Sequence, residues 1–216
     1  MDTKKIAEDL HHNVPANWYY QSLKIDPLQR FWHNSRFREV KKVSEKAENV
    51  LDIGCADGIF TNVILNATFA KKITGLDVVK TSILWAKKHW KNNKKMNFVV
   101  GDAHDLKFES DTFDAVYCLE ALEHVVNPIK VLSEFKRVMK NGGFGVFLVP
   151  SDNYLFRIIW WLWLHFYPRG WVWRDTHIQT YKDNYLSKVC KKIGFKIEID
   201  KKFNLGMLHL VKVRKT

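Results

Sequence analysis

The sequence predicts an α/β fold in which seven mostly parallel strands form a doubly wound sheet that ends in an antiparallel hairpin. Three observations predict it. Short apolar segments alternate with segments of helical period between residues 49 and 150, which indicates parallel strands with helices on both faces. Residues 113–120 are apolar almost throughout, as a strand buried on both faces requires. Residues 194–203 and 206–215 are strand-like neighbours that indicate the hairpin.

The individual elements follow from the same periods along the chain. Each expected strand is a short apolar run, and these runs are residues 49–53, 72–79, 96–103, 113–120 and 143–150. Each expected helix repeats its apolar residues every three or four positions, and these helices are residues 28–46, 58–67, 81–91, 128–140 and 182–193. Asn141-Gly142-Gly143 is typical of a helix C-cap, so it should end the helix at 128–140.

Length and composition indicate a single globular domain. The chain has 216 residues, of which 46 % are hydrophobic, enough for a well-buried core. We expect a helical N-terminal cover (1–48), a core (49–150), an aromatic insertion (151–177) and a C-terminal helix with two strands (178–216). The net charge of +12 favours an anionic partner, either nucleic acid or a phospholipid surface. It is equally compatible with a merely solvated surface, because lysine is spread along the chain.

The cysteines and the N-terminal residues argue against some classes of protein. Cys55, Cys118 and Cys190 form no C-x-x-C pair, so neither a disulfide framework nor a zinc site is indicated. The first thirteen residues contain no apolar segment of the kind that a signal peptide has. We therefore expect a cytoplasmic protein with reduced cysteines.

The most informative segment is VLDIGCADGIF, at Val50–Phe60. A strand leads into small residues at positions 54, 56 and 58, and a helix follows. Small residues let the backbone turn tightly and let a ligand approach it closely. The segment is not a dinucleotide fingerprint, because Ala56 and Ile59 stand where G-x-G-x-x-G requires glycine, and no G-K-[ST] follows as a Walker loop requires. A plain tight turn remains the alternative.

Two acidic residues end the next two expected strands. Asp77 follows Gly58 by 19 positions, and its carboxylate could accept hydrogen bonds from both hydroxyls of a ribose. Asp102, in Gly101-Asp102-Ala103, could accept from an adenine amino group. Each residue alone could be a helix N-cap. Three such junctions at one edge of a sheet favour an adenosine-containing ligand.

These segments together resemble a known family, the class I S-adenosylmethionine-dependent methyltransferases of the ubiquinone/menaquinone-biosynthesis-like (type 11) group. The matching segments are VLDIGCADG, GLDVV, GDAHDL, FDAVYCLEALEHVVNP and FKRVMKNGGFGVFLVP. They lie in the family's order over Asn49–Pro150, nearly half the chain. The resemblance implies a Rossmann-like sheet, S-adenosyl-L-methionine as cofactor and methyl transfer as the activity.

The resemblance also implies roles at the glycine loop and in the N-terminal helix. The methionine and ribose portion of the cofactor would lie against Asp52, Gly54, Ala56 and Gly58. Ala56 departs from the family, which usually has glycine there, and its methyl group would crowd the methionine portion slightly. Arg36 could meet the cofactor carboxylate, or it could be a surface arginine.

Further roles lie at the ends of the second, third and fourth strands. By the same resemblance, Asp77 would hold the ribose and Val78 would lie against adenine. Asp102 and Ala103 would contact the adenine edge, and Leu119 would contact the methionine end. The segment Cys118–Ala121 lacks the [ND]PP[YF]-like pattern that base-methylating enzymes often have, which argues against N-methylation of adenine or cytosine.

The segment after the fourth strand contains candidate proton acceptors. Glu120, Glu123 and His124 would share one face of a helix, where some enzymes that this chain resembles are thought to bind a metal. Carboxylates favoured by the helix dipole are the alternative, and we expect no metal. His124 titrates near neutral pH in its free form and is the first candidate base. His177 is the second, because some relatives place a histidine facing the acceptor there. Either could be structural.

The segment FRIIWWLWLHFYPRGWVWRDTH, residues 156–177, contains five of the nine tryptophans. Its longest apolar run between Arg157 and His165 is too short to span a membrane, which takes about 20 residues. It could be a lid over a hydrophobic acceptor, with Pro168-Arg169-Gly170 as a turn at its tip. It could be a membrane-interface patch, flanked by Arg157, Arg169 and Arg174. It could also be ordinary core with Trp160 and Trp161 packed inward.

The sequence thus predicts methyl transfer to a small or lipid-like acceptor, at oxygen, with peripheral contact to an anionic membrane. RNA methylation is an alternative that the charge supports, although no RNA-binding appendage is recognisable. A cofactor-binding interaction module without catalysis is the other alternative. The sequence does not indicate the oligomeric state.

Overall fold

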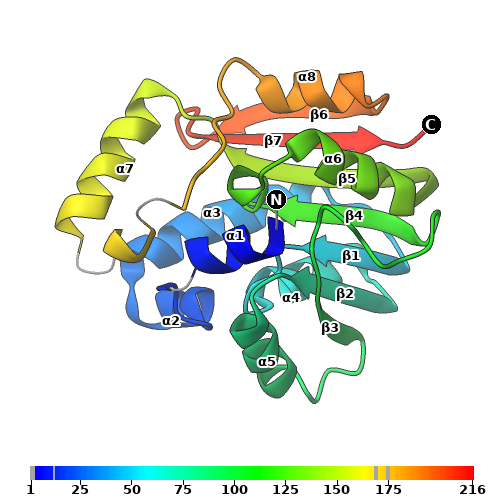
Figure 1. Cartoon of the computed structure of the whole chain (residues 1–216), viewed down its shortest axis with the longest axis horizontal. Helices are drawn as coiled ribbons and strands as arrows, with labels where there is room; N and C mark the ends of the chain where they lie inside the picture. The colour runs from blue at the N-terminus through cyan, green and yellow to red at the C-terminus, as the bar shows by residue number, and fades with distance from the viewer. Residues whose placement is uncertain (1–2, 12, 168–169, 174–175) are drawn as a thin grey trace.

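The computed structural model describes residues 3–11, 13–167, 170–173 and 176–216. Seven strands form one sheet in the order β3-β2-β1-β4-β5-β7-β6 (Figure 1). Every neighbouring pair from β3 to β5 is parallel, whereas β7 is antiparallel to both β5 and β6. This confirms the predicted sheet and hairpin. The strands are β1 (Asn49–Ile53), β2 (Lys72–Asp77), β3 (Met96–Val100), β4 (Phe113–Leu119), β5 (Met139–Pro150), β6 (Lys196–Phe203) and β7 (Leu208–Arg214).

Helices cover both faces of the sheet and its carboxyl-end edge, where α1, α2 and α7 lie (Figure 1). The first two helices lie in the N-terminal cover that was predicted to be helical, but their individual positions were not predicted. The α-helices are α1 (Thr3–Leu10), α2 (Trp18–Ile25), α3 (Pro27–Val43), α4 (Ile59–Thr68), α5 (Lys80–His89), α6 (Pro128–Val138), α7 (Tyr154–Phe166) and α8 (Tyr185–Lys192). Two short 3₁₀ turns are η1 (Leu122–His124) and η2 (Gly170–Trp173).

The alternation of side chains along β1 and β4 divides them between two large hydrophobic clusters. In β1, Leu51 and Ile53 belong to a cluster with α6 and α8, whereas Val50 belongs to a cluster with α3 and α4. In β4, Val116 and Cys118 face the first cluster and Tyr117 faces the second. Neighbouring residues of a strand point to opposite faces, so a nearly continuous apolar run fills both layers.

Local sequence signals set the start of α3, but the signal for the end of α6 was misread. α3 begins where the Asp26 side chain accepts a hydrogen bond from the backbone N–H of Gln29 at 3.0 Å, with Pro27 in the first turn. The predicted C-cap after α6 was wrong. β5 begins at Met139, directly after α6, and the glycine pair lies inside that strand. Gly142 has φ of +78°, and the pairing with β4 shifts register there, so these glycines form an irregularity of the strand.

The segment after β4 also differs from its prediction. Glu120 has φ of +56° and lies between β4 and η1. Because only Leu122–His124 is helical there, Glu120, Glu123 and His124 do not form one helix face.

Asp52 gives the fold a predictable pH dependence. Its carboxyl is 1 % exposed and accepts a hydrogen bond from the Thr61 hydroxyl at 2.6 Å. Burial raises its pKa from 3.8 to about 7, so the folded state binds this proton more strongly than the unfolded state. Its contribution to stability is therefore lost as pH rises from about 4 to 7.

We expect Asp52→Asn to gain stability relative to the wild type between pH 5 and pH 8, by about 2–3 kcal/mol. The free energy of unfolding in urea at both pH values measures this. Asp114→Asn is the control, because hydrogen bonds from Lys140 and Asn49 outweigh burial and lower the pKa of Asp114. Its effect should be nearly constant over the same interval. A difference in unfolding free energy between Asp52→Asn and the wild type that stays constant from pH 5 to pH 8 would contradict the raised pKa of Asp52.

Candidate functional site

The glycine loop between β1 and α4 has an alternating backbone conformation. Gly54, Ala56 and Gly58 have φ of +75°, +45° and +80°. This explains the spacing of small residues, since glycine adopts positive φ at no steric cost and other residues do so only at a penalty of about 1–2 kcal/mol. Ala56 takes that penalty at the position where the family usually has glycine.

Asp77, at the end of β2, holds the loop in place. One carboxylate oxygen accepts from the N–H of Ala56 and the other from the N–H of Val79, both at 2.8 Å. The loop also binds β2 directly, because the N–H groups of Gly54 and Cys55 donate to the carbonyl of Leu76. Burial raises the pKa of Asp77. A carboxylate has about four lone-pair sites, so Asp77 can accept from a ligand in addition to these backbone groups.

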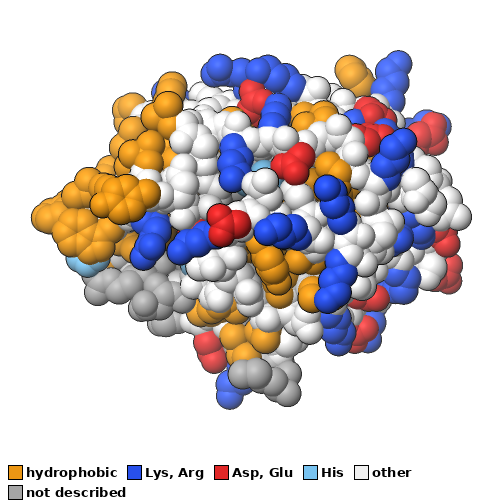
Figure 2. All heavy atoms as spheres, turned by 90° about the horizontal axis from the view of Figure 1, so that it is seen from above, with side chains coloured by type: hydrophobic (Ala, Val, Ile, Leu, Met, Phe, Trp, Pro, Cys, Tyr) orange, Lys and Arg blue, Asp and Glu red, His pale blue; other side chains and the backbone are white. Residues whose placement is uncertain are grey.

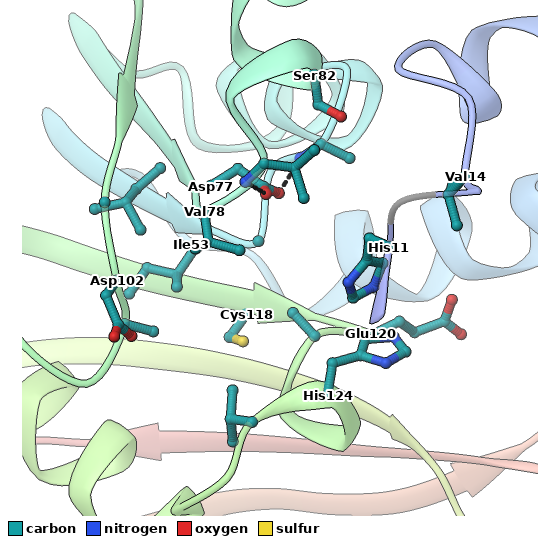
Figure 3. Close-up of a pocket in the computed structure, with 18 of the residues that line it drawn as sticks. His11, Val14, Ile53, Asp77, Val78, Ser82, Asp102, Cys118, Glu120 and His124 are labelled. Carbon is teal, nitrogen blue, oxygen red and sulfur yellow. Dashed lines mark hydrogen bonds between the residues drawn. The ribbon is translucent and has the colours of Figure 1, made fainter. Parts of the chain in front are cut away.

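A cavity opens beside this loop at the carboxyl ends of the strands, and we call it the first cavity (Figure 3). It brings together six residues that were predicted for the cofactor: Gly54, Ala56, Asp77, Val78, Asp102 and Ala103. These six belong to three consecutive strand ends that are far apart in sequence, and the parallel order of the sheet places them side by side.

Four predicted cofactor residues do not line the first cavity. Asp52 and Leu119 point to the opposite face of the sheet from Ile53 and Cys118, which do line it. The alternation of side chains in a strand explains both differences. Gly58 faces β3 and α5, where an added Cβ would lie 2.7 Å from the Phe98 ring. The glycine is therefore required by packing.

Arg36 is the fourth, and it is buried rather than on the surface. It forms an ion pair with Glu120 and contacts the His33 ring. Burial lowers its pKa from 12.5 to about 10. Arg36 lines a second cavity, so the structure does not bring it to the first.

Asp102 is engaged by other residues at the far end of the first cavity. Its carboxylate accepts from the Thr3 hydroxyl and from the backbone N–H and ring of His104. Burial opposes its ionisation, but these hydrogen bonds outweigh burial and keep the pKa of Asp102 low. The group is therefore a carboxylate at neutral pH, which suits an amino-group donor.

The second cavity adjoins the first and is larger, at about 320 Å³ against about 120 Å³. Its walls are mostly aromatic and aliphatic side chains from α2, α3 and α7. Five residues line both cavities: Trp18, Tyr19, Glu120, His124 and Trp173. A molecule in one cavity would thus be close to a molecule in the other.

Of the two predicted bases, His124 is buried at this junction, and His177 is half-buried beside it in the second cavity. The His124 ring is 4.7 Å from His11 and 5.1 Å from His177, measured between centroids. His124 Nδ1 donates to the carbonyl of Thr176 at 2.7 Å, which leaves Nε2 as its acceptor. Burial lowers the pKa of His124 well below 6.5 and that of His177 to about 4. Both imidazoles are therefore neutral at pH 7.

Glu123 completes a group that could hold a cation. Ligand atoms of Glu123, His124 and His177 all lie within 4.8 Å of one another, and two imidazoles with a carboxylate suit several divalent metals. Burial raises the pKa of Glu123 to about 8, so without a cation its carboxyl is protonated at neutral pH. Glu120 is not in this group, because it pairs with Arg36.

The aromatic segment forms one wall of the second cavity and also a large exposed surface. Of the residues of α7, only Phe156 is fully buried. Trp160 stacks on His177 with ring centroids 4.9 Å apart. Trp161 is 53 % exposed, so the alternative in which Trp160 and Trp161 both pack inward as core is wrong for Trp161. Arg169, Arg174 and most of the predicted turn lie outside the described residues.

Sequence reasoning missed the residues that reach the site from the N-terminus. His11, Trp18 and Tyr19 line the first cavity, yet no motif surrounds them in sequence. His33 lines the second. Their positions depend on how α1–α3 pack across the strand ends, which periodicity in the chain does not reveal. The aromatic content of residues 18–20 was the available signal.

The first cavity fits an adenosyl ligand by the chemistry of its walls. Two carboxylates, Asp77 and Asp102, offer acceptors to hydroxyl and amino donors. Between them lie apolar side chains, among them Leu76, Val78 and Ala103, which suit the faces of an adenine ring. A nucleoside-binding site at the carboxyl ends of parallel strands is typical of Rossmann-like folds.

Comparison with known proteins identifies the class. The family described as "Methyltransferase domain" matches residues 51–147. A ubiquinone biosynthesis O-methyltransferase of Coxiella burnetii is 27 % identical over 164 residues, 74 % of this chain and 68 % of that protein. One from Dechloromonas aromatica is 32 % identical over 162 residues, 72 % and 66 %. The chain belongs to the class I S-adenosylmethionine-dependent methyltransferases.

Solved structures agree with this fold. An S-adenosylmethionine-dependent methyltransferase of Thermotoga maritima superposes with a TM-score of 0.73 at 16 % identity, covering 97 % of this chain and all of that chain. One from Mesorhizobium loti gives 0.65 at 17 % identity, covering 94 % and 99 %. At such identity the likeness concerns the fold, and the cofactor follows from the family.

The glycine loop yields a test of packing against backbone strain. An added Cβ at Gly54 would lie 2.3 Å from the Ala121 Cβ, whereas at Gly142 it would meet nothing within 4 Å. Both glycines have nearly the same φ. We expect Gly142→Ala to cost about 1–2 kcal/mol of unfolding free energy. Gly54→Ala should cost at least about 2 kcal/mol more. If urea titrations gave the two variants equal losses of unfolding free energy, Ala121 would have to move away from the added methyl group without cost.

Proposed function

We propose that this methyltransferase methylates an oxygen atom of an apolar, lipid-like acceptor that occupies the second cavity. The observation that supports the proposal is the pair of adjoining cavities. The first has the carboxylates and apolar walls that suit the cofactor, and the second is larger, apolar and joined to it through His124. An acceptor in the second cavity would lie next to the methyl donor.

Six residues would hold the cofactor: Gly54, Ala56, Asp77, Val78, Asp102 and Ala103. When bound, S-adenosylmethionine supplies an electrophilic methyl group on a sulfonium. Asp77 is proposed to accept from the ribose hydroxyls and Asp102 from the adenine amino group. Gly54 and Ala56 leave the loop backbone open to the methionine portion. Asp52, Gly58 and Leu119 would support this site through packing rather than contact.

The acceptor would be oriented by the walls of the second cavity and lose its proton to an imidazole. Alignment of the reacting groups and removal of that proton are the main tasks of the protein. His177 lies in the second cavity and His124 at the junction. Both rings are neutral at pH 7 and have a free lone pair, although the burial that lowers the pKa of each ring also makes it a weaker base than a free imidazole. The stacked Trp160 holds the His177 ring in one orientation.

Oxygen is proposed as the acceptor atom on the strength of the relatives. The matched proteins of Coxiella burnetii and Dechloromonas aromatica are named ubiquinone biosynthesis O-methyltransferases. Their name gives oxygen as the atom that they methylate and places that reaction in ubiquinone biosynthesis. The mostly apolar second cavity of this chain has room for a lipid-like molecule.

Membrane contact is proposed from the outer surface of α7. Exposed apolar side chains gather at the end of the molecule that α7 forms (Figure 2). We call this the α7 apolar surface, and its members are Tyr154, Ile158, Trp161, Leu162, Phe166 and Trp171. Arg157 is also exposed on this helix. Among the described residues no helix is long and apolar enough to cross a bilayer, so contact would be peripheral.

We expect the protein to transfer labelled methyl groups from S-adenosylmethionine into a lipid extract, measured as label that partitions into organic solvent. His177→Gln should lower this rate about 100-fold without changing the affinity for S-adenosylhomocysteine. His165→Gln, an exposed histidine of α7, is the control and should keep wild-type activity. Parallel reactions with and without a chelator test whether the methyl-transfer rate depends on a metal bound at Glu123, His124 and His177.

Other outcomes of this assay would replace the proposal. Label found in RNA and none in lipid would favour RNA methylation. No transfer to either, by a protein that binds S-adenosylhomocysteine, would favour an interaction module without catalysis. Full activity of His177→Gln would exclude His177 as the base.

The α7 apolar surface predicts binding to vesicles that contain anionic phospholipid. Replacing Trp161 and Phe166 together by Glu should reduce the sedimented fraction about fivefold or more, because both side chains leave the bilayer interface. Phe69→Glu is the matched control. Phe69 is 75 % exposed but lies at the C-terminal end of α4. Equal loss in both variants, or none in either, would contradict membrane contact through α7.

A further inference from the structure

Three exposed apolar residues stand at an opening of the second cavity. Leu28 and Phe31 of α3 and Ile159 of α7 line this cavity, yet these residues are 59 %, 69 % and 43 % exposed. A residue that lines a cavity and is also exposed to solvent marks a place where the cavity reaches the surface. We call these three residues the rim. None of the three lines the first cavity, so the rim marks an opening that is separate from the junction of the two cavities.

The two sides of this opening come from distant parts of the chain, and one carboxylate joins them. Asp26 lies at the start of α3, where one of its oxygens accepts a hydrogen bond from the N–H of Gln29 at 3.0 Å. Its other oxygen accepts from the hydroxyl of Tyr167, which directly follows α7. Figure 1 shows the turn between α2 and α3 and the C-terminal end of α7 at the same end of the molecule. The position of the opening is therefore set by a bond between its two sides.

Further exposed apolar residues extend the rim on both sides. Ile25, the last residue of α2, is exposed and lies three positions before Leu28 in the chain. On α7, Ile159 directly follows Ile158 and precedes Leu162 by three positions, so it adjoins two members of the α7 apolar surface. Exposed apolar side chains thus border the opening on the side of α3 and on the side of α7. Contiguous exposed apolar surface of this kind marks a site of contact with another molecule or a membrane.

The charges beside the opening favour a bilayer over a second copy of the chain. Lys24, Arg30 and Arg157 are exposed, and each directly precedes one of these exposed apolar residues in the chain. In a symmetric dimer, the same surface of a second copy would bring the same cations to the interface, where like charges repel. An anionic bilayer offers opposite charge at its headgroups and an apolar layer beneath them. Such a bilayer matches both the cations and the rim.

We propose that the opening between α3 and α7 faces the acyl layer of an anionic phospholipid bilayer, and that a lipid-soluble molecule passes through it into the second cavity. This inference rests on the lipid-like acceptor proposed above. It adds the rim residues of α3 as the second half of the membrane contact, and it makes the opening the route of entry. A molecule that takes this route moves between two apolar environments and does not expose its apolar surface to water.

Quenching of a fluorescent label on vesicles tests where the opening faces. The three native cysteines are buried, so a cysteine introduced at the surface can be labelled selectively with nitrobenzoxadiazole. Vesicles of phosphatidylglycerol and phosphatidylcholine would have a nitroxide at the middle of the acyl chain, and the same vesicles without nitroxide give the reference. The label on Phe31→Cys and on Ile159→Cys should lose about half of its fluorescence or more, as expected for groups within the bilayer interface. Phe69→Cys, at an exposed position after α4, is the control and should not be quenched.

Two results of this measurement would overturn the proposal. One is quenching of Phe31→Cys and Ile159→Cys that is no stronger than that of Phe69→Cys. The other is quenching of Trp161→Cys with none of Phe31→Cys, because the membrane contact would then be confined to α7. The labels report position and need no methyl acceptor or turnover. Failure of the proposed lipid methylation would therefore leave the result unaffected.

Entry through the opening is tested without vesicles, using the uncharged apolar dye N-phenyl-1-naphthylamine. Replacing Leu28 and Phe31 together by Glu should slow the rise of dye fluorescence in stopped-flow mixing about fivefold or more, because charges at the rim oppose the entry of an apolar molecule. Phe69→Glu with Leu84→Glu is the matched double control, since both positions are exposed and neither lines a described cavity. Equal rates in the two double variants would place the entry elsewhere and overturn the proposal.

Sedimentation velocity of the free protein tests the competing occupant. The wild type and the variant with Glu at positions 28 and 31 should have the same oligomeric state, because the rim contacts a bilayer. A wild-type dimer that this variant converts to a monomer would assign the rim to a second copy of the chain, and the proposal would fall. All four substituted positions are exposed, so the variants are expected to fold, and equal urea midpoints would verify this.

Discussion

The carboxylate of Asp77 is the interaction on which the site depends. It accepts one N–H from the glycine loop and one from its own turn, so it ties the ends of β1 and β2 together. The left-handed residues at 54, 56 and 58 give the loop a shape that presents the Ala56 N–H to that carboxylate. Burial of an acidic group costs free energy unless hydrogen bonds compensate it. Here the same bonds offset part of that cost, although burial still raises the pKa of Asp77, and they fix the site.

The second constraint is the alternation of side chains in parallel strands. Because neighbouring residues face opposite layers, each strand end divides its side chains between the cavity and the core. Cys118 faces the cavity while Leu119 packs under α3 and α4, and Ile53 faces the cavity while Asp52 packs against Thr61. The site is thus a continuation of the core at one edge of the sheet. A change in strand register would destroy both together.

Much of the fold and part of the site could be predicted because their signals are local. The period of apolar residues located all seven strands, and glycine spacing located the loop. Asp77 and Asp102 were found because strand ends of a parallel sheet meet at one edge. Arg36, by contrast, was expected at the cofactor. Its position beside Glu120 and His33 is set by how α3 packs, and sequence periodicity gives no information on that packing.

The sequence by itself determined the class of fold, the cofactor and the positions of the strands along the chain, since these depend on backbone period, turn residues and motifs close in the chain. Tertiary structure alone decided that the cavities adjoin, that His11 meets His124, and that α7 exposes most of its apolar surface. Those features join segments separated by more than a hundred residues. Their free energy comes from contacts that exist only after the sheet has formed, so no local pattern encodes them.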